Sequence, residues 1–464
     1  MKVSFHGAAR NVTGSCHLLE CADKKILVDC GLYQGRREIT EENSASFGFD
    51  PSDIDYLLLT HAHLDHCGRI PLLAKRGFTG EIITTAATVE LARLVMLDAA
   101  GLQEDEARYQ SRRTRRRGRR HNKKYEPLYT TLDALNSLAF FGRQASYNEM
   151  ITLAPGIRAT FIDAGHSLGS ASIVLDLEEH GRKHRILFSG DLGYSARPIL
   201  RDPAPPPHVD SVVMETTYGG RLHKRLQPSI DELYAAINET IGRGGNVIVP
   251  TFALERAQEI LFYLREGVED RRIEHFVNVF LDSPMAISAT RIFERHPECF
   301  DSETLKISHD HGDPFDLPGL HFTRETAESM MINKIESGAV IMAGSGMCTG
   351  GRVRHHLKHN LWRRKSSIIF VGYAARGTLG RRIIDGAQRV RIFGEEIPVR
   401  ASIHTIGGFS AHADQAELLA WHQQTGNPKT TFLVHGEEDS MGEFAKNLTD
   451  TRVEMPSLHQ EYEL

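Results

Sequence analysis

Long apolar runs and cysteines are scarce in this sequence, and each shortage excludes a class of protein. No stretch of its 464 residues approaches the ~20 apolar residues that cross a membrane. Residues 1–14 also lack the long apolar stretch of a signal peptide or an anchor, so neither is expected. The six cysteines show no metal-finger spacing. We therefore expect a cytoplasmic protein with reduced thiols and no membrane partner.

Strong positive charge is missing as well. Lys and Arg number 55 against 60 Asp and Glu, which gives a formal net charge of −5. Contacts with nucleic acid must therefore come from local basic clusters. One such cluster is the run 112–124, in which nine of the thirteen residues are Lys or Arg. We expect this run to be a solvated surface loop that also acts as a basic arm against a nucleic-acid backbone.

The sequence does contain a dense group of metal-ligand side chains. His61, His63, Asp65 and His66 follow directly on the apolar run 54–60, which predicts a buried strand. Imidazole nitrogens and carboxylate oxygens bind Zn²⁺ at roughly 2.0–2.2 Å. Four ligands within six residues are too crowded for one tetrahedral ion, whereas they suit two adjacent metals.

Three more ligand-type residues stand beside glycine at the ends of predicted strands. His166, Asp191 and His435 follow the strand-like segments 158–162, 185–187 and 430–432. Glycine permits a tight turn and a close approach of the backbone. Each residue alone is more often part of a turn, but as a set they complete the first cluster. We therefore predict that all three are metal ligands.

The middle of the chain, from about residue 220 to 395, alternates strand with helix. Strands are predicted at 246–249, 339–343 and 367–371, and they lead into helices at 253–264, near Val353 and at 381–385. This alternation predicts a parallel sheet with ligands at the carboxyl ends of its strands. Other histidines carry less weight. Residues 308–313, before Pro314, are expected to be a loop, and His355 and His356 are expected in the helix near Val353.

Two glycine-rich loops, 344–351 and 377–380, open helices in this region. Small residues let backbone N–H groups reach an anion, although plain turn chemistry is the alternative. Neither loop has the Gly-Lys-Ser/Thr of an ATP site, so we expect the loops to hold the backbone phosphates of a polymer. The candidate substrate-binding residues are Ser345, Gly346, Arg352, Arg376, Thr378 and Ser410.

Motifs spread over essentially the whole chain carry a family resemblance. They are 26–31 (Ile-Leu-Val-Asp-Cys-Gly), the 61–66 cluster, His166, Ser189-Gly190-Asp191, Glu215 in 214–218, His412 in 409–414, and His435. With these motifs in this order, the sequence resembles metallo-β-lactamase-fold nucleases of the β-CASP group. That group contains the cleavage and polyadenylation nuclease subunit, ribonuclease J, and bacterial and archaeal relatives. The sequence resembles the polyadenylation-nuclease branch more than ribonuclease J, because no long extension follows His435.

The resemblance implies an α/β fold, in which an αββα sandwich carries an inserted Rossmann-like β-CASP domain. The expected domains are 1–219 and 396–464 for the sandwich and 220–395 for the insertion, with the active site in the cleft between them. The resemblance also implies two Zn²⁺ ions per chain. One is expected on His61, His63 and His166, and the other on Asp65, His66 and His435, with Asp191 bridging the two.

The same resemblance implies a mechanism. A hydroxide activated by the two metals attacks an RNA phosphodiester and leaves 5′-phosphate and 3′-hydroxyl ends. His412 is expected as the general acid, Glu215 as the carboxylate that orients it, and Asp65 as a ligand that also belongs to the catalytic group. Asp29 is expected to position ligands through hydrogen bonds. The expected partner is single-stranded RNA, in RNA processing or decay.

Several alternatives stay open. A thioesterase or lactonase of the same fold shares the 61–66 motif but does not need the insertion, Glu215 or His412. A non-catalytic RNA-binding subunit is disfavoured because no ligand position is missing. A DNA nuclease of the β-CASP group is disfavoured by His435, where that branch has Val. Endo- or exonuclease action, zinc against iron, and a monomer against a homo-oligomer are not decided by the sequence.

Overall fold

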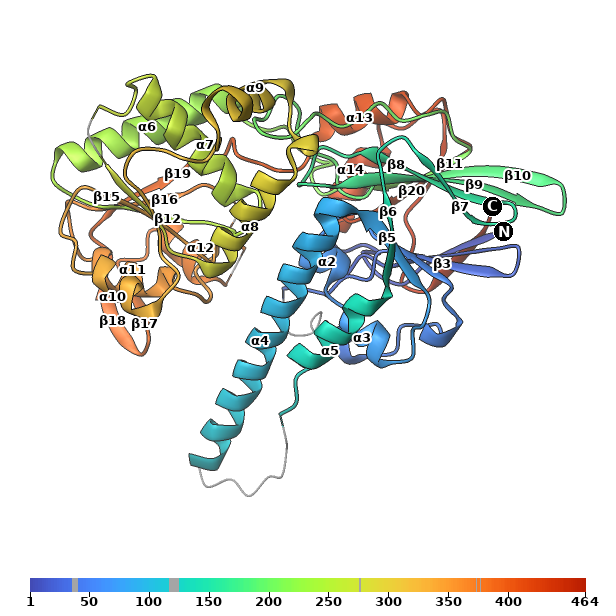
Figure 1. Cartoon of the computed structure of the whole chain (residues 1–464), viewed down its shortest axis with the longest axis horizontal. Coiled ribbons are helices and arrows are strands. Elements are labelled where there is room, and N and C mark those ends of the chain that lie inside the picture. The colour runs from blue at the N-terminus through green and yellow to red at the C-terminus, as the bar shows by residue number, and fades with distance from the viewer. Residues whose placement is uncertain (36–40, 117–124, 275–276, 373, 376) are drawn as a thin grey trace. The chain divides into compact units, whose positions relative to one another are not determined.

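The computed structural model describes residues 1–35, 41–116, 125–274, 277–372, 374–375 and 377–464 of the chain (Figure 1). They divide into two units. Unit 1 comprises Met1–Ser195, Asp202–Leu222 and His412–Leu464. Unit 2 comprises Ala196–Arg201 and His223–Ala411, so it is inserted into unit 1. Within the described residues, no helix combines the length and the apolar character needed to cross a membrane.

Two seven-stranded sheets form unit 1. The first has the order β22-β1-β2-β3-β4-β5-β6 and the second β21-β20-β11-β10-β9-β8-β7. The strands of the first sheet are β1 (Lys2–Phe5), β2 (His17–Cys21), β3 (Lys24–Val28), β4 (Tyr56–Leu58), β5 (Glu81–Thr85), β6 (Phe141–Ala145) and β22 (Gln460–Glu463). Those of the second are β7 (Met150–Ala154), β8 (Ile157–Asp163), β9 (Ala171–Glu179), β10 (Arg182–Phe188), β11 (Ser211–Glu215), β20 (Thr430–Val434) and β21 (Arg452–Glu454).

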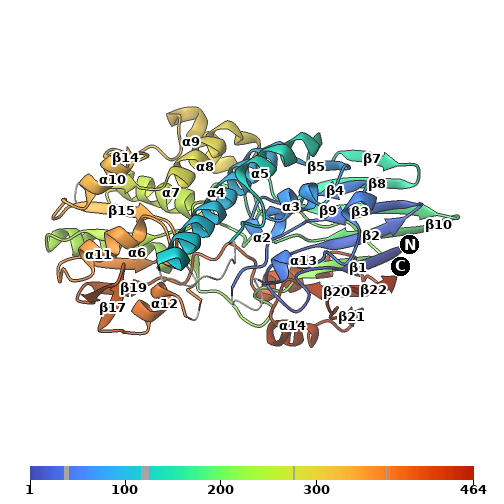
Figure 2. The same ribbon diagram turned by 90° about the horizontal axis from the view of Figure 1, so that it is seen from below.

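The two sheets pack face to face. One buried apolar cluster draws side chains from both, for example Phe5 and Val28 of the first sheet and Phe161 and Phe188 of the second. Burying such side chains stabilises by roughly 1.5–3 kcal/mol each. The last strand, β22, pairs antiparallel with β1, and Figure 2 shows the two termini close together.

Helices cover the outer face of each sheet, which confirms the expected αββα sandwich. Trp421 and Phe444, on the helices over the second sheet, pack against its buried Leu187 and Leu433. Figure 2 shows the helices over the first sheet. The helices of unit 1 are α2 (Leu64–Cys67), α3 (Ile70–Lys75), α4 (Ala86–Arg116), α5 (Thr131–Ser137), α13 (Gln415–Gln423) and α14 (Glu438–Ala445).

Helix α4 extends well past its apolar part. The apolar periodicity stops near Ala99 and Ala100, which are buried, whereas the helix continues to Arg116. Good helix formers such as Gln, Glu, Ala and Arg follow, and they extend a helix without an apolar face. Figure 1 shows this second part of α4 reaching beyond the sheets of unit 1. The basic run begins within it, and residues 117–124 of the run lie outside the described part of the chain.

Unit 2 contains a six-stranded sheet of order β14-β13-β15-β12-β16-β19, in which every pairing is parallel, as the alternation predicted. Its strands are β12 (Val247–Pro250), β13 (Asn278–Leu281), β14 (Leu320–Phe322), β15 (Ala339–Ala343), β16 (Ser367–Phe370) and β19 (Ser402–Thr405). A hairpin, β17 (Arg389–Ile392) and β18 (Glu395–Pro398), stands apart from it. The helices are α6 (Leu226–Gly242), α7 (Arg256–Glu269), α8 (Pro284–Arg295), α9 (Ser302–His311), α10 (Thr326–Ile332), α11 (Val353–Asn360) and α12 (Leu379–Ile384).

One segment of unit 2 differs from expectation. The segment expected as a loop at 308–313 is mostly helix, because α9 runs to His311. Asp301 caps this helix by accepting from the Thr304 N–H at 2.6 Å, and Pro314 lies beyond its end, a position that proline commonly takes. β19 pairs with β16, and unit 2 extends to Ala411. The expected boundary at 395 stays a prediction.

Candidate metal centre

Strand ends bring the predicted ligands together at one edge of unit 1. β8, β10, β11 and β20 run in the same direction, because β8 and β10 both pair antiparallel with β9 and the other pairings are parallel. Their carboxyl ends lead to His166, Asp191, Glu215 and His435 respectively. The 61–66 cluster follows the end of β4 in the facing sheet. Residues far apart in the chain therefore meet at this edge.

The ligand atoms lie in two groups. One contains His61, His63, His166 and Asp191, and the other contains Asp65, His66 and His435; the atoms of each group all lie within 4.8 Å of one another. His63 Nδ1 is 3.1 Å from Nε2 of both His61 and His166. His66 Nε2 is 3.2 Å from His435 Nε2. Asp191 reaches both groups, with Oδ2 3.5 Å from His61 Nε2 and Oδ1 3.3 Å from His66 Nε2.

These separations fit metal ligation. Nitrogens bound to one tetrahedral Zn²⁺ at 2.0–2.1 Å stand roughly 3.3 Å apart, close to the observed spacing. Asp191 Oδ1 is buried and, among the described residues, has no hydrogen-bond partner of adequate geometry. A buried carboxylate oxygen without a partner is costly unless it binds a cation. The chemistry and spacing of these residues therefore fit metal binding, and Asp191 lies within reach of both groups.

The backbone adopts strained and close-packed forms around the cluster. Asp29 and His435 have positive φ angles of 62° and 49°, a region that non-glycine residues avoid and that is often retained at functional sites. Gly31 lies so close to the turn carrying Asp65 that a Cβ would stand 1.6 Å from the Asp65 carbonyl oxygen. Glycine at 31 thus allows the β3 end to seat the ligand-bearing helix α2.

Burial and charge set the protonation of the first ligand group. Burial lowers the pKa of His63 to about 4, against the opposing effect of Asp65, and lowers the pKa of His61 well below its ordinary value. Both imidazoles are therefore neutral at pH 7, as metal ligation requires. For Asp191, burial favours the protonated acid, but His435 and His66 outweigh it and hold its pKa well below the usual range.

The second group behaves differently in the absence of metal. Burial opposes the charged form of His66, yet Asp191 and Asp29 raise its pKa well above the ordinary value. The pKa of His435 is likewise raised by Asp191 and Asp65 against the effect of burial. These two imidazoles must lose protons before they can bind a metal, so metal binding here releases protons and strengthens as pH rises.

His435 is fixed by a residue that sequence reasoning missed. The Thr217 hydroxyl donates to the His435 carbonyl oxygen at 3.1 Å, which leaves it to accept from His435 Nδ1 at 3.0 Å. His435 Nε2 therefore faces the cluster, and it offers a lone pair there once it has lost its proton. Thr217 lies two residues after Glu215 within a motif that the sequence did single out, but no spacing rule indicates its partner.

Glu215 and His412 form a pair beside the ligand groups. The carboxylate of Glu215 is buried and lies 3.2 Å from His412 Nδ1, and it also accepts from the Leu192 N–H at 2.6 Å. His412 Nδ1 is 3.9 Å from Asp191 Oδ2. Burial disfavours the imidazolium, but Glu215 and Asp191 raise the pKa of His412 to about 10. At neutral pH His412 is thus a protonated imidazolium that faces the ligands, which is the state required of an acid.

The predicted substrate-binding residues lie in unit 2, except that Arg376 falls outside the described residues. Arg352 forms an ion pair with the buried Asp282 at 2.7 Å and donates to the carbonyls of Thr323 and Arg324. Its guanidinium is therefore committed to partners that follow the ends of β13 and β14. Thr378 caps α12 by accepting from the Arg381 N–H. These two side chains serve the local fold, and their contact with a substrate stays a prediction.

The other three are distributed around the same edge of unit 2. The Ser345 hydroxyl accepts from the Gly350 N–H at 3.3 Å within its own loop. Gly346 packs against the half-exposed ring of Phe252, which a Cβ would approach to 2.9 Å. Ser410 is the second-last residue of unit 2, just before the chain returns to unit 1 at His412.

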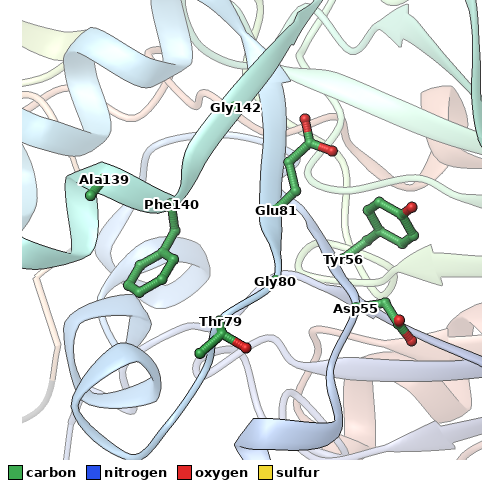
Figure 3. Close-up of a pocket in the computed structure, with 8 residues that line it drawn as sticks. All are labelled: Asp55, Tyr56, Thr79, Gly80, Glu81, Ala139, Phe140 and Gly142. Carbon is green, nitrogen blue, oxygen red and sulfur yellow. The ribbon is translucent and has the colours of Figure 1, made fainter.

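A wide hollow of about 460 Å³ lies at the opposite end of β4 and β5 from the ligand groups (Figure 3). Its lining residues are Asp55, Tyr56, Thr79, Gly80, Glu81, Ala139, Phe140 and Gly142. Its carboxylates are already paired, Glu81 with Arg143 at 2.7 Å and Asp55 with Lys24 at 2.6 Å. The hollow offers no group for catalysis, so its size alone does not make it a candidate active site.

Comparisons with known proteins agree with this arrangement. Family models match residues 9–251 (metallo-beta-lactamase superfamily), 257–383 (Beta-Casp domain) and 396–456 (Zn-dependent metallo-hydrolase RNA specificity domain). The chain is 40% identical over 441 residues to Ribonuclease TTHA0252 of Thermus thermophilus, covering 95% of this chain and 94% of that protein. It is 32% identical over 456 residues to Transcription termination factor FttA of Methanocaldococcus jannaschii, covering 96% and 68%. A protein of unknown function from Enterococcus faecalis V583 shares the fold, with a TM-score of 0.54 at 12% identity over 100% of this chain and 99% of that one.

Proposed function

The chain belongs to the metallo-β-lactamase superfamily and its β-CASP ribonuclease group, and from that premise we propose that it hydrolyses phosphodiester bonds of single-stranded RNA in a zinc-dependent reaction. The observation that most strongly supports this proposal is the buried Glu215–His412 pair, which lies beside two groups of candidate metal ligands. A small-molecule hydrolase of the same fold does not need that pair. RNA is preferred over DNA because of the match to an RNA specificity domain and the ribonuclease relative.

His61, His63 and His166 would hold one Zn²⁺, and Asp65, His66 and His435 the other, with Asp191 shared. When bound, two such ions supply Lewis acidity that lowers the pKa of water and neutralises charge on a phosphate. The protein itself supplies the proton. His412, protonated at neutral pH, donates a proton to the departing 3′-oxygen as the P–O3′ bond breaks. Water adds to phosphorus and releases one proton to the solvent, from which His412 is protonated again. The products are a 5′-phosphate and a 3′-hydroxyl.

Glu215 acts through His412. Its oxygen faces His412 Nδ1, so the proton on Nδ1 is retained and Nε2–H is the one available to the leaving group. The backbone N–H groups of Leu192 and Thr217 hold the carboxylate in place at 2.6 and 3.3 Å. The pair is thereby positioned before substrate binds, which reduces the reorganisation required during the reaction.

The test uses purified protein with single-stranded RNA and DNA of one sequence, labelled at the 5′ or the 3′ end. We expect cleavage of RNA to 5′-phosphate products, abolished by a chelator and restored by Zn²⁺. His63→Ala should be inactive, whereas Lys429→Ala, an exposed side chain of unit 1, should match the unmodified protein. Cleavage that persists in His63→Ala, or that favours DNA, overturns the proposal.

A further inference from the structure

The hydroxyl of Thr60 occupies a junction between two ligand histidines and the carboxylate of Asp29. Thr60 is 1% exposed and follows β4 immediately before His61. Its Oγ1 lies 3.0 and 2.9 Å from the two oxygens of Asp29 and 3.1 Å from His61 Nδ1. Its backbone N–H also donates to Asp29 Oδ1 at 2.8 Å. No sequence motif pointed to a role for this side chain beyond ending a strand.

The number of protons that Thr60 and Asp29 carry determines which group donates and which accepts in each of these hydrogen bonds. A threonine hydroxyl has one proton to donate, and a carboxylate can only accept. The proton of Thr60 therefore points to Asp29, and only lone pairs remain for His61. His61 must then donate from Nδ1, which leaves the lone pair on Nε2. That atom is the one 3.1 Å from His63 Nδ1 and 3.5 Å from Asp191 Oδ2.

Asp29 applies the same constraint to His66. Its Oδ2 lies 2.7 Å from His66 Nδ1, so His66 donates from Nδ1 and turns Nε2 toward Asp191 and His435. Thr60 fixes the position of that carboxylate through both its N–H and its hydroxyl. Thr60 thus contacts His61 of the first ligand group directly. It also contacts Asp29, which in turn holds His66 of the second group.

We infer that Thr60 is a positioning residue of the metal centre, whose hydroxyl holds His61 and, through Asp29, His66 with Nε2 directed at the metals. This inference rests on the metal centre of the proposed function. Partners of this kind orient ligands and typically change metal affinity by about 10- to 100-fold when they are removed. The two sites should therefore weaken together when the hydroxyl is lost.

The test compares two substitutions of similar bulk. Thr60→Val keeps the shape and removes the hydroxyl, whereas Thr60→Ser keeps the hydroxyl and removes a methyl group. Metal-free protein is titrated with Zn²⁺ against a competing chelator, and its fold is checked by circular dichroism and thermal unfolding. We expect Thr60→Val to bind Zn²⁺ about 10- to 100-fold more weakly and Thr60→Ser to match the unmodified protein. If Thr60→Val does not fold without metal, Thr60→Ala, which also lacks the hydroxyl, replaces it.

The possible outcomes distinguish a failure of the role inferred for Thr60 from a failure of the proposed function. Equal Zn²⁺ affinity in Thr60→Val and the unmodified protein overturns the inference and leaves the proposed function intact. Equal weakening in Thr60→Ser and Thr60→Val also overturns it, because packing of the methyl group would then be responsible. An unmodified protein that binds no Zn²⁺ overturns the metal centre and this inference with it. A protein that binds Zn²⁺ but does not cleave RNA contradicts the proposed function alone.

Discussion

Replacing Glu215 by Gln tests whether the carboxylate acts only through His412. Gln keeps the shape and an oxygen for the Leu192 N–H, but it removes the negative charge 3.2 Å from His412 Nδ1. A hydrogen bond to a charged group contributes about 1.5–3 kcal/mol and one between neutral groups about 0.5–1.5 kcal/mol. The substitution therefore removes about 1–1.5 kcal/mol, which slows cleavage about 5- to 13-fold at 1.36 kcal/mol per tenfold.

The pH dependence of cleavage should also shift in a defined direction in the Glu215→Gln variant. Glu215 helps raise the pKa of His412 to about 10, so its loss lowers that pKa and the rate of the variant should decline from a lower pH than that of the unmodified enzyme. Below that range both should hold the imidazolium. Single-turnover cleavage of labelled RNA at saturating enzyme, measured across pH, isolates the chemical step from product release.

The decisive comparison is the double mutant. His412→Ala alone should slow cleavage by about 10²–10⁴-fold, as is typical for a general acid. If Glu215 acts only through His412, adding Glu215→Gln should slow the reaction no further, because its partner is already gone. A substrate whose leaving group has a low pKa should partly rescue both variants. Multiplicative losses in the double mutant, or no rescue, would refute this account of the pair.

Three further predictions concern metal content, RNA affinity and stability. Elemental analysis of fresh protein should find two metal ions per chain and fewer in His63→Ala; one tightly bound ion in the unmodified protein would contradict the two-ion centre. Replacing five arginines of the basic run with Ala should flatten the salt dependence of RNA binding, by about 0.7 in log–log slope per lost phosphate contact, while cleavage of a very short RNA stays unchanged; the five are Arg115, Arg116, Arg117, Arg119 and Arg120. An unchanged slope with reduced short-RNA cleavage would show that the run supports the fold. Burial, together with Glu303 and Asp270, raises the pKa of Glu266 from 4.5 to about 7, so its favourable contribution to folding is present below pH 4.5 and lost as pH rises through about 7. Glu266→Gln should therefore raise the melting temperature relative to the unmodified protein at pH 8 but not at pH 4, and equal differences at both pH values would show that its charge is irrelevant.

Local sequence patterns predicted the parts of this molecule that repeat regularly. The parallel sheet of unit 2 followed from alternating apolar segments, and β15 begins and ends where the pattern placed it, at Ala339 and Ala343. The length of α4 did not follow, because its second part has no apolar face and the signal for a helix stops with that face. Likewise residues 308–313 were expected as a loop because Pro314 follows them, whereas α9 runs to His311.

The candidate ligands could be named from the sequence because imidazoles and carboxylates cluster or stand beside glycine at strand ends. The residues that hold these ligands in position could not be named from the sequence. Thr60 and Thr217 are ordinary residues in sequence, and they matter only because the fold places each hydroxyl about 3 Å from a particular Nδ1. The ion pair of Arg352 with Asp282, which follows a strand distant in sequence, could not be predicted either. The expected phosphate contact of Arg352 stays a prediction.

The insertion of unit 2 between Glu215 and His412 has a consequence for the time at which activity can begin. Seven of the nine candidate ligand and acid–base residues precede the insertion, and His412 and His435 follow it. A chain that is still being translated therefore lacks its acid and one ligand until 223–411 have been made, which takes roughly 10–40 s at 5–20 residues per second. During that interval the nascent chain holds an incomplete set of candidate ligands. The candidate acid and the last candidate ligand reach the site only after the inserted unit has been translated.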